Sequence, residues 1–190
     1  MIRIAIVGNI GSGKTYISKL FNYPVFNADQ IVSKIYSKDK NIYLKLKKKI
    51  PDFIFNFPIK KEVLINAIIK DKRNIRIISS IVHPAVRKKL KIFLKKNKKR
   101  KIVILDIPLY LENKMNKKKD IIVFVKSNYK ETLKRIKKRN NFNQLIFQRF
   151  KILQLPTNLK KKKSHYVIKN DFNKNNARKR VQDVLKMIML

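Results

Sequence analysis

A run of eight residues near the start of the chain has the types and spacing of a phosphate-binding loop. The run that matches the pattern G-x-x-x-x-G-K-[ST] is Gly8-Asn9-Ile10-Gly11-Ser12-Gly13-Lys14-Thr15. In this pattern successive backbone N–H groups curl around a β-phosphate, and the start of the next helix adds partial positive charge. Lys14 is expected to reach the β- and γ-phosphate oxygens, and the Thr15 hydroxyl to bind Mg²⁺. The run therefore predicts a site for ATP and Mg²⁺, whose phosphate contacts are Gly8, Gly11, Ser12, Gly13, Lys14, Thr15 and Tyr16.

The distribution of glycine supports this interpretation. Average usage would give a chain of this length about 13 glycines, yet it has three, and all of them lie in the loop. Glycine is needed where φ is positive or where a ligand must approach the backbone closely. A glycine turn without a ligand is the alternative, and the setting of the loop argues against it.

That setting is a buried strand, the loop, and then a helix. Residues 3–7 form a short apolar run rich in β-branched residues, and helical spacing begins at Lys14. Further strands are expected at 24–27, 101–107, 120–126 and 166–168, and helices within 30–100, 128–163 and 177–190. The stretch 76–82 fits a strand or a helix equally well. Strands that alternate with helices predict an α/β fold with a parallel five-stranded sheet flanked by helices.

Length and composition limit the classes of protein. The chain has 190 residues, which suits one compact domain. It has no cysteine, which excludes disulfides and thiolate metal sites. No apolar run is long enough to span a membrane, and the loop follows Met1 too closely for a signal peptide. A cytoplasmic protein is expected.

The net charge of +38 would ordinarily indicate a nucleic-acid or membrane partner. However, the lysines are spread along the chain, and the abundance of Lys, Ile and Asn is typical of a gene rich in A and T. We expect no specific nucleic-acid partner, although the charge should attract polyphosphates.

The loop and the chain length together favour a small-molecule kinase. The sequence lacks the N-K-x-D motif that reads guanine, which argues against a GTPase. Asp29 follows the second expected strand, at the edge of an open sheet where ligands bind. It could orient the acceptor hydroxyl or could cap the next helix, and its position alone does not decide between these roles.

The chain resembles dephospho-coenzyme A kinases over nearly its whole length. Beyond the loop, the matching segments are Val25-Phe26-Asn27-Ala28-Asp29, Ile81-Val82-His83-Pro84, Asp106-Ile107-Pro108-Leu109-Tyr110-Leu111-Glu112, Leu133-Lys134-Arg135 with Arg139, Gln154, and Val167-Ile168-Lys169-Asn170. The His-Pro pair, the Asp-x-Pro-Leu-x-x-Glu segment and the order of the segments are the most specific of these.

The resemblance implies transfer of phosphate from ATP to the ribose 3′-hydroxyl of dephospho-coenzyme A, the last step of coenzyme A biosynthesis. It implies a nucleotide-binding core (1–29, 101–127 and 165–190), a helical coenzyme-binding insertion (30–100) and a helical lid (128–164). Asp29 matches the family's catalytic carboxylate, which favours the role of base or orienter. The oligomeric state is not predicted.

The resemblance also suggests roles for five other residues. His83 is expected to bind or shape the substrate site, although a lone histidine is more often structural. Arg135 and Arg139 match the lid and are expected to contact phosphate, the alternative being a solvated helix face. Asp106 is expected to hold the water shell of Mg²⁺. Asn170 is expected to contact adenine, or to be a turn asparagine.

The sequence departs from the family pattern at several positions. Asn27 stands where an aspartate is usual, Asn9 where a glycine is common, and Tyr16 where a small hydroxyl residue follows the loop. His165 replaces an aspartate and Asp171 a glycine. None of these changes affects Lys14, Thr15 or Asp29, so an active enzyme is still expected.

Two other functions compete with this one. Another small-molecule kinase, acting on a nucleoside, a nucleotide or shikimate, would share the core and differ in the acceptor insertion. A nucleic-acid-binding ATPase would instead show activity stimulated by DNA or RNA.

Overall fold

The structure is a computed structural model that describes residues 1–140 and 142–190. The chain divides into two compact units. The sheet unit holds Met1–Asn27, Asn97–Asn143 and Phe150–Leu190, and the helical unit holds Ala28–Lys96 and Gln144–Arg149. Within the described residues, no helix is long and apolar enough to cross a membrane.

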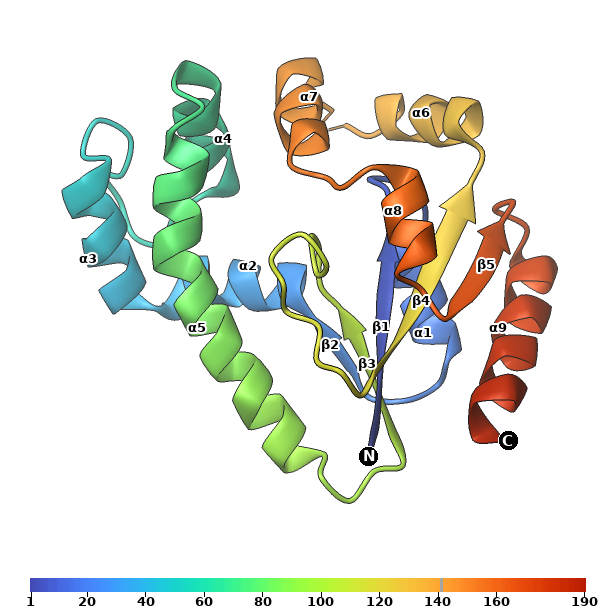
Figure 1. The fold of residues 1–190 in the computed structure, drawn as a ribbon. Helices are drawn as coiled ribbons and strands as arrows, with labels where there is room; N and C mark the ends of the chain where they lie inside the picture. Colours follow the sequence, from blue (N-terminus) through green and yellow to red (C-terminus); the bar gives the residue numbers. More distant parts are fainter. Residues whose placement is uncertain (141) are drawn as a thin grey trace. The chain divides into compact units, whose positions relative to one another are not determined.

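The sheet unit contains a five-stranded sheet in which every pairing is parallel, as the sequence predicts. The strands are β1 (Ile2–Gly8), β2 (Val25–Asn27), β3 (Ile102–Asp106), β4 (Asp120–Ser127) and β5 (Tyr166–Asn170). Their order is β2-β3-β1-β4-β5 (Figure 1). The chain therefore leaves β1 toward one edge of the sheet and, after β3, crosses to the other side of β1. Ligands in such sheets bind beyond the carboxyl ends of the strands where the direction reverses, which here is beside β1 and β3.

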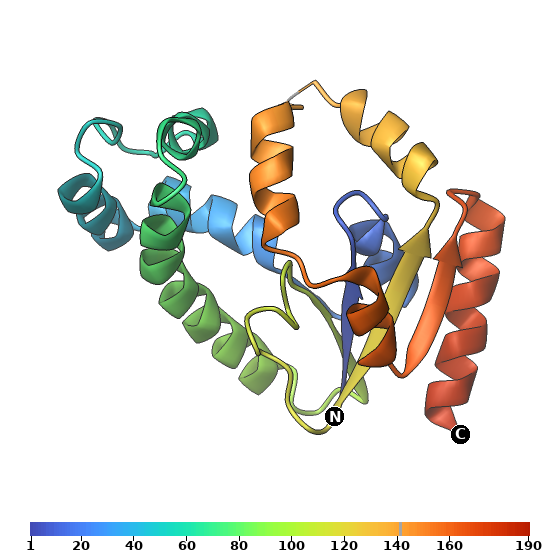
Figure 2. The same cartoon turned by 45° about the horizontal axis from the view of Figure 1, so that its top comes forward.

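Helices cover both faces of the sheet. The sheet unit contains α1 (Lys14–Leu20), α6 (Tyr129–Lys137), α8 (Thr157–Lys162), α9 (Lys174–Met189) and the end of α7 (Gln144–Ile152). α1 and α9 contact each other, and α8 lies on the opposite face, against β1 (Figures 1 and 2). α9 packs through Ala177, Val181 and Val184, whose spacing of four and three residues forms one apolar stripe.

The core of the sheet unit is built from the central strands. Ile4, Ile6, Ile104 and Val123 are fully buried, and Ile17 of α1 packs against them. A strand buried on both faces has no reason to alternate polar and apolar residues. This explains the continuous apolar runs that identified β1, β3 and β4 in the sequence.

The helical unit is formed by α2 (Ala28–Lys38), α3 (Lys40–Lys49), α4 (Lys61–Lys70), α5 (Asn74–Lys96) and the first six residues of α7. α5 contacts α2, α3 and α4. The stretch 76–82, which the sequence left open, lies in α5 and is helical. The prediction that 30–100 is mainly helical is thus confirmed.

Pro84 lies inside α5. It has no N–H to donate to the carbonyl one turn earlier, so it removes one hydrogen bond of the helix. The buried Asn74 begins the same helix and donates its side-chain amide to the carbonyl of Ala67 at 2.8 Å, which ties α5 to α4.

The stretch 128–163 contains the three helices α6, α7 and α8, and the described residues 138–140 and 142–143 between α6 and α7 are not helical. The predicted break at Pro156 lies between α7 and α8. α8 begins directly after that proline. The assignment of 30–100 to a coenzyme-binding insertion and of 128–164 to a lid stays a prediction.

Candidate active site

The phosphate-binding loop joins the carboxyl end of β1 to the start of α1, which is the predicted arrangement of strand, loop and helix. Gly11 and Gly13 have φ values of 77° and 88°, in the left-handed region that side chains disfavour. Gly13 also forms the N-cap of α1. As a glycine, it offers no side-chain cap at this end of the helix, and helix N-termini of this kind bind anions in other proteins.

Neighbouring side chains impose a second requirement for glycine. A Cβ atom on Gly11 would overlap the side chain of Ile136 in α6, and one on Gly13 would overlap the amide of Asn170. The loop is therefore enclosed by α6 and by the end of β5. Glycine is needed here for packing as well as for backbone conformation.

Asn170 supports the loop directly. Its side chain is 3% exposed, and its Nδ2 donates to the carbonyl of Ser12 at 2.8 Å. Its Oδ1 accepts from the backbone N–H of Phe172 at 3.1 Å. The structure thus gives Asn170 a role in holding the loop, which the sequence did not predict, and its contact with adenine stays a prediction.

Ser12 is also buried, and its Oγ has no hydrogen-bond partner among the described residues. A buried hydroxyl without a partner is uncommon in a folded protein. Its position in the loop is consistent with a partner that arrives with a ligand.

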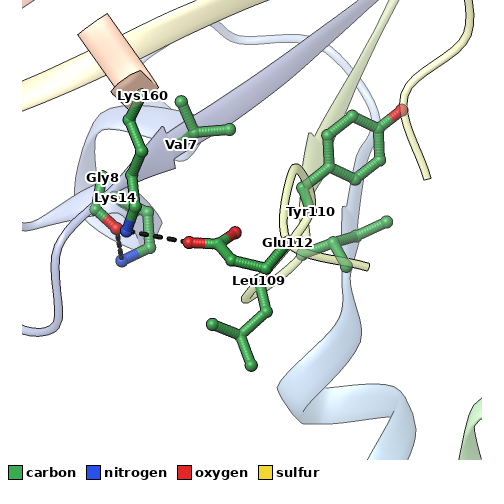
Figure 3. Close-up of a pocket in the computed structure, with 8 residues that line it drawn as sticks. Val7, Gly8, Lys14, Leu109, Tyr110, Glu112 and Lys160 are labelled. Carbon is green, nitrogen blue, oxygen red and sulfur yellow. Dashed lines mark hydrogen bonds and ion pairs between the residues drawn. The ribbon is translucent and has the colours of Figure 1, made fainter. Parts of the chain in front are cut away.

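Lys14 lies in a small pocket at the carboxyl ends of β1 and β3 (Figure 3). Its Nζ donates to the carbonyls of Gly8 and Asn9 at 3.1 and 2.9 Å. Thr15 is exposed at the start of α1 and is accessible to a ligand. Tyr16 is 38% exposed, so it does not occupy the interior of the loop.

Asp106 ends β3 and is 3% exposed. It accepts a hydrogen bond of 2.6 Å from the side-chain amide of Asn27, which is paired with it at the end of β2. An amide donor stabilises the ionised form of a buried carboxylate.

Two predicted site residues, Asp29 and His83, lie in the helical unit. Asp29 is exposed in the first turn of α2, where a negative charge interacts favourably with the helix dipole. The helix begins at Ala28, before Asp29, so Asp29 is not its N-cap. His83 is half-buried in α5, and burial, assisted by the charge of Arg87, lowers the pKa of its imidazole.

The two predicted lid arginines have different surroundings. The Arg135 guanidinium in α6 lies 4.3 Å from the ring centroid of Phe172, in a cation–π contact. Arg139 is exposed and lies beyond the end of α6, which stops at Lys137. The two side chains therefore do not share the face of a single helix.

A profile of the family described as Dephospho-CoA kinase matches residues 2–176. Among curated proteins, the dephospho-CoA kinase of Wolbachia sp. subsp. Brugia malayi is 32% identical over 98% of both chains. That of Wolbachia pipientis wMel is 31% identical with the same coverage. The chain belongs to the dephospho-CoA kinase family.

Solved structures agree on the fold. The crystal structure of TT1252 from Thermus thermophilus matches with a TM-score of 0.82 at 23% identity, covering 100% of this chain and 98% of that one. The dephospho-CoA kinase from Campylobacter jejuni matches with a TM-score of 0.66 at 22% identity, covering 98% and 96%. Shikimate kinase from Bacteroides thetaiotaomicron has the lower TM-score of 0.55.

His165 and Asp171, which also depart from the dephospho-CoA kinase pattern, have structural partners on either side of β5. His165 accepts a hydrogen bond from the backbone N–H of Ile122 through Nδ1 at 3.0 Å, beside the start of β5. Asp171 accepts from Asn176 Nδ2 at 2.8 Å and pairs with Arg180 at 3.0 Å. The hydrogen bonds to this exposed carboxylate lower its pKa. Both residues stabilise the segments that flank β5.

Sequence reasoning did not assign a role to Lys160. This lysine begins the basic run 160–163, one of several lysine runs along the chain. In the structure it is buried and lines the same pocket as Lys14, together with Glu112 (Figure 3). The one sequence signal that could have distinguished Lys160 from the exposed lysines 161–163 is its position four residues after Pro156, early in α8.

Proposed function

We propose that this chain transfers the γ-phosphoryl group of ATP to the ribose 3′-hydroxyl of dephospho-CoA. The observation that carries the proposal is the match to the dephospho-CoA kinase family over residues 2–176. The geometry of the phosphate-binding loop supports it, because the loop has its left-handed glycines, its lysine and the helix start in the arrangement that grips a triphosphate.

In this proposal the loop amides and the start of α1 bind the β-phosphate, and Lys14 bridges the β- and γ-phosphates. Lys14 now donates to two loop carbonyls, so it exchanges these partners for phosphate oxygens. Exposed residues Arg135 and Arg139 supply further positive charge from the predicted lid. The high net charge of the chain attracts both polyphosphate substrates.

The donor set of the site fits Mg²⁺. The Thr15 hydroxyl and the Asp106 carboxylate are hard oxygen ligands, and Mg²⁺ usually takes only one or two protein ligands beside water and phosphate. Thr15 would bind the ion directly and Asp106 through its water shell. Bound there, the ion would neutralise charge on the β- and γ-phosphates.

Asp29 accepts or orients the proton of the acceptor hydroxyl. The oxygen of that hydroxyl forms a bond to the γ-phosphorus while the bond from the γ-phosphorus to the bridging oxygen breaks, and ADP leaves. His83 contributes to binding of the coenzyme. We assign the reaction to the cytoplasm, with ATP and dephospho-CoA as partners and no specific nucleic acid.

The test is an acceptor panel with purified protein and Mg-ATP. Dephospho-CoA should yield CoA, identified by mass spectrometry and phosphorus NMR, while shikimate, deoxyadenosine and added DNA or RNA should produce no turnover. Lys14→Ala should lose about 10²-fold or more in kcat, as for removal of one charge-stabilising donor. Lys19→Ala, an exposed change on the same helix, should retain activity. An inert dephospho-CoA alongside a phosphorylated alternative acceptor would contradict the proposal.

A further inference from the structure

Lys160 is the one lysine buried in the part of the chain that the structure describes. It is 2% exposed, in a protein with 49 lysines and arginines. Burial of an ammonium group is costly unless the group is paired and hydrogen-bonded. A lysine kept from solvent in this way, while its neighbours Lys161 to Lys163 are exposed, needs a specific reason.

Its contacts tie α8 to the phosphate-binding loop. The Lys160 Nζ lies 3.0 Å from Glu112 Oε1 and 3.4 Å from Asn9 Oδ1 in the loop. The same Asn9 donates through Nδ2 to Thr157 Oγ1 at 2.9 Å, at the start of α8. Glu112 also accepts from the backbone N–H of Leu155 at 3.0 Å. Lys160 is thus held at the edge of the loop from two sides.

The segment that carries Glu112 is itself anchored. Tyr110 donates its hydroxyl to Asp120 Oδ2 at 2.6 Å, and Asp120 pairs with Arg3. Burial, with the hydrogen bond to Asp120, raises the pKa of the Tyr110 hydroxyl, so it remains a donor. Glu112 therefore projects from a fixed segment, and it fixes Lys160 in turn.

The pocket still has an excess of positive charge. An ammonium group has three donors, and Lys160 has two polar partners among the described residues, one of them at the long distance of 3.4 Å. Lys14 and Lys160 both line the pocket, against the single carboxylate of Glu112 (Figure 3). The remaining donor of Lys160 therefore faces a pocket that also contains the lysine of the phosphate-binding loop.

We propose that Lys160 contacts the γ-phosphate of the bound nucleotide and is a catalytic residue of this site. The inference rests on the proposed function only in taking ATP as the nucleotide. The pocket extends from Lys14 toward the segment after β3, away from β5 and Asn170. In the proposed function Lys14 bridges the β- and γ-phosphates, so a cation on the β3 side of Lys14 is placed to meet the γ-phosphate. Glu112 holds Lys160 in this position before the nucleotide binds.

The test compares nucleotides that differ in the γ-phosphate. Calorimetry with Mg²⁺ would measure the affinity of Lys160→Met for ADP and for a non-hydrolysable ATP analogue. A hydrogen bond between charged groups makes the expected loss about 10-fold or more for the analogue, with little change for ADP. Lys160→Arg should retain most of the preference for the analogue. Lys162→Met, an exposed change on the same helix, should bind both nucleotides as the unmodified protein does.

A second variant distinguishes a folding defect from the selective loss of affinity for the ATP analogue. Removing Lys160 alone leaves the Glu112 carboxylate without its cation. Lys160→Met combined with Glu112→Gln removes both charges and keeps an acceptor for the Leu155 N–H, so this variant should fold and show the same selective loss. Equal losses for both nucleotides, or no loss for the analogue, would overturn the inference. The binding assay contains no acceptor, so failure of dephospho-CoA as a substrate would leave this result intact.

Discussion

Asn170→Ala tests whether this asparagine holds the phosphate-binding loop or contacts adenine. The change removes the donor to the Ser12 carbonyl and the acceptor for the Phe172 N–H, at 2.8 and 3.1 Å, from a side chain that is 3% exposed. Each buried polar group left without a partner costs about 1–3 kcal/mol. We therefore expect the free energy of unfolding to fall by about 2–6 kcal/mol, because two such groups lose their partner.

The nucleotide assay separates the two roles. If Asn170 acts through the loop, the affinities for ATP and GTP fall by the same factor, because the loop binds the phosphates that the two share. If Asn170 recognises adenine, ATP loses affinity and GTP does not. The control is Asn173→Ala, which removes the N-cap of α9 and should cost about 1 kcal/mol of stability without changing nucleotide binding.

Gly13 provides an independent check on the same contact. A Cβ atom at Gly13 would overlap the Asn170 amide, so Gly13→Ala combines a steric clash with the strain of a φ of 88°. In the Asn170→Ala background the clash disappears and only the strain remains, about 1–2 kcal/mol. The double-mutant cycle should thus give a favourable coupling of about 0.5–3 kcal/mol. Additive effects of the two changes on chemical denaturation would refute this account of the loop.

Three further predictions concern the other polar residues. Asp29→Asn should lower kcat by about 10²–10⁴-fold with unchanged ATP affinity, and a kcat within a few-fold of normal would rule out a role in proton transfer. His83 has a folded-state pKa below its ordinary 6.5, because of burial and then Arg87. The unfolded chain therefore takes up a proton that the folded chain does not, and stability should fall as the pH drops below about 6.5. His83→Gln should weaken this dependence in thermal unfolding at pH 7.5 and 5.5, and an unchanged dependence would contradict it. Asn27→Asp would place a second carboxylate against Asp106, now 2.6 Å from the amide. One of the two pKa values should rise, so this variant should gain stability relative to the unmodified protein as the pH is lowered from about 7 to about 5 in thermal unfolding. A constant difference between the two proteins would contradict this.

The fold was predictable because its strands are buried. Runs such as 101–107 and 120–126 have few polar residues, since a parallel strand is covered on both faces. The stretch 76–82 was ambiguous for the same reason, because a short apolar run has no period that separates strand from helix. Its place in the 23-residue helix α5 depends on contacts with α2, α3 and α4, which are far from it in sequence.

The phosphate-binding loop was predictable because its function requires consecutive residues. The side chains that support it come from distant segments, and their types say little about their partners. Asn170 could be a turn asparagine until its amide is seen to bond Ser12, 158 positions away. Lys160 is one of four consecutive lysines, and only the position of α8 against β1 makes it a buried cation.

Because the chain is so rich in lysine, the burial of Lys160 is more informative than its presence. In a protein with a net charge of +38, an exposed lysine costs little and indicates little. Burial reverses this, because a charge removed from water must be stabilised by specific partners. Lys160 has one carboxylate and one more distant amide oxygen as partners, at 3.0 and 3.4 Å, and it lines the same pocket as Lys14. An anion entering that pocket would accept a hydrogen bond from the remaining donor of Lys160. Its negative charge would also offset the two ammonium charges that line the pocket, so nucleotide binding should raise the stability of the folded protein.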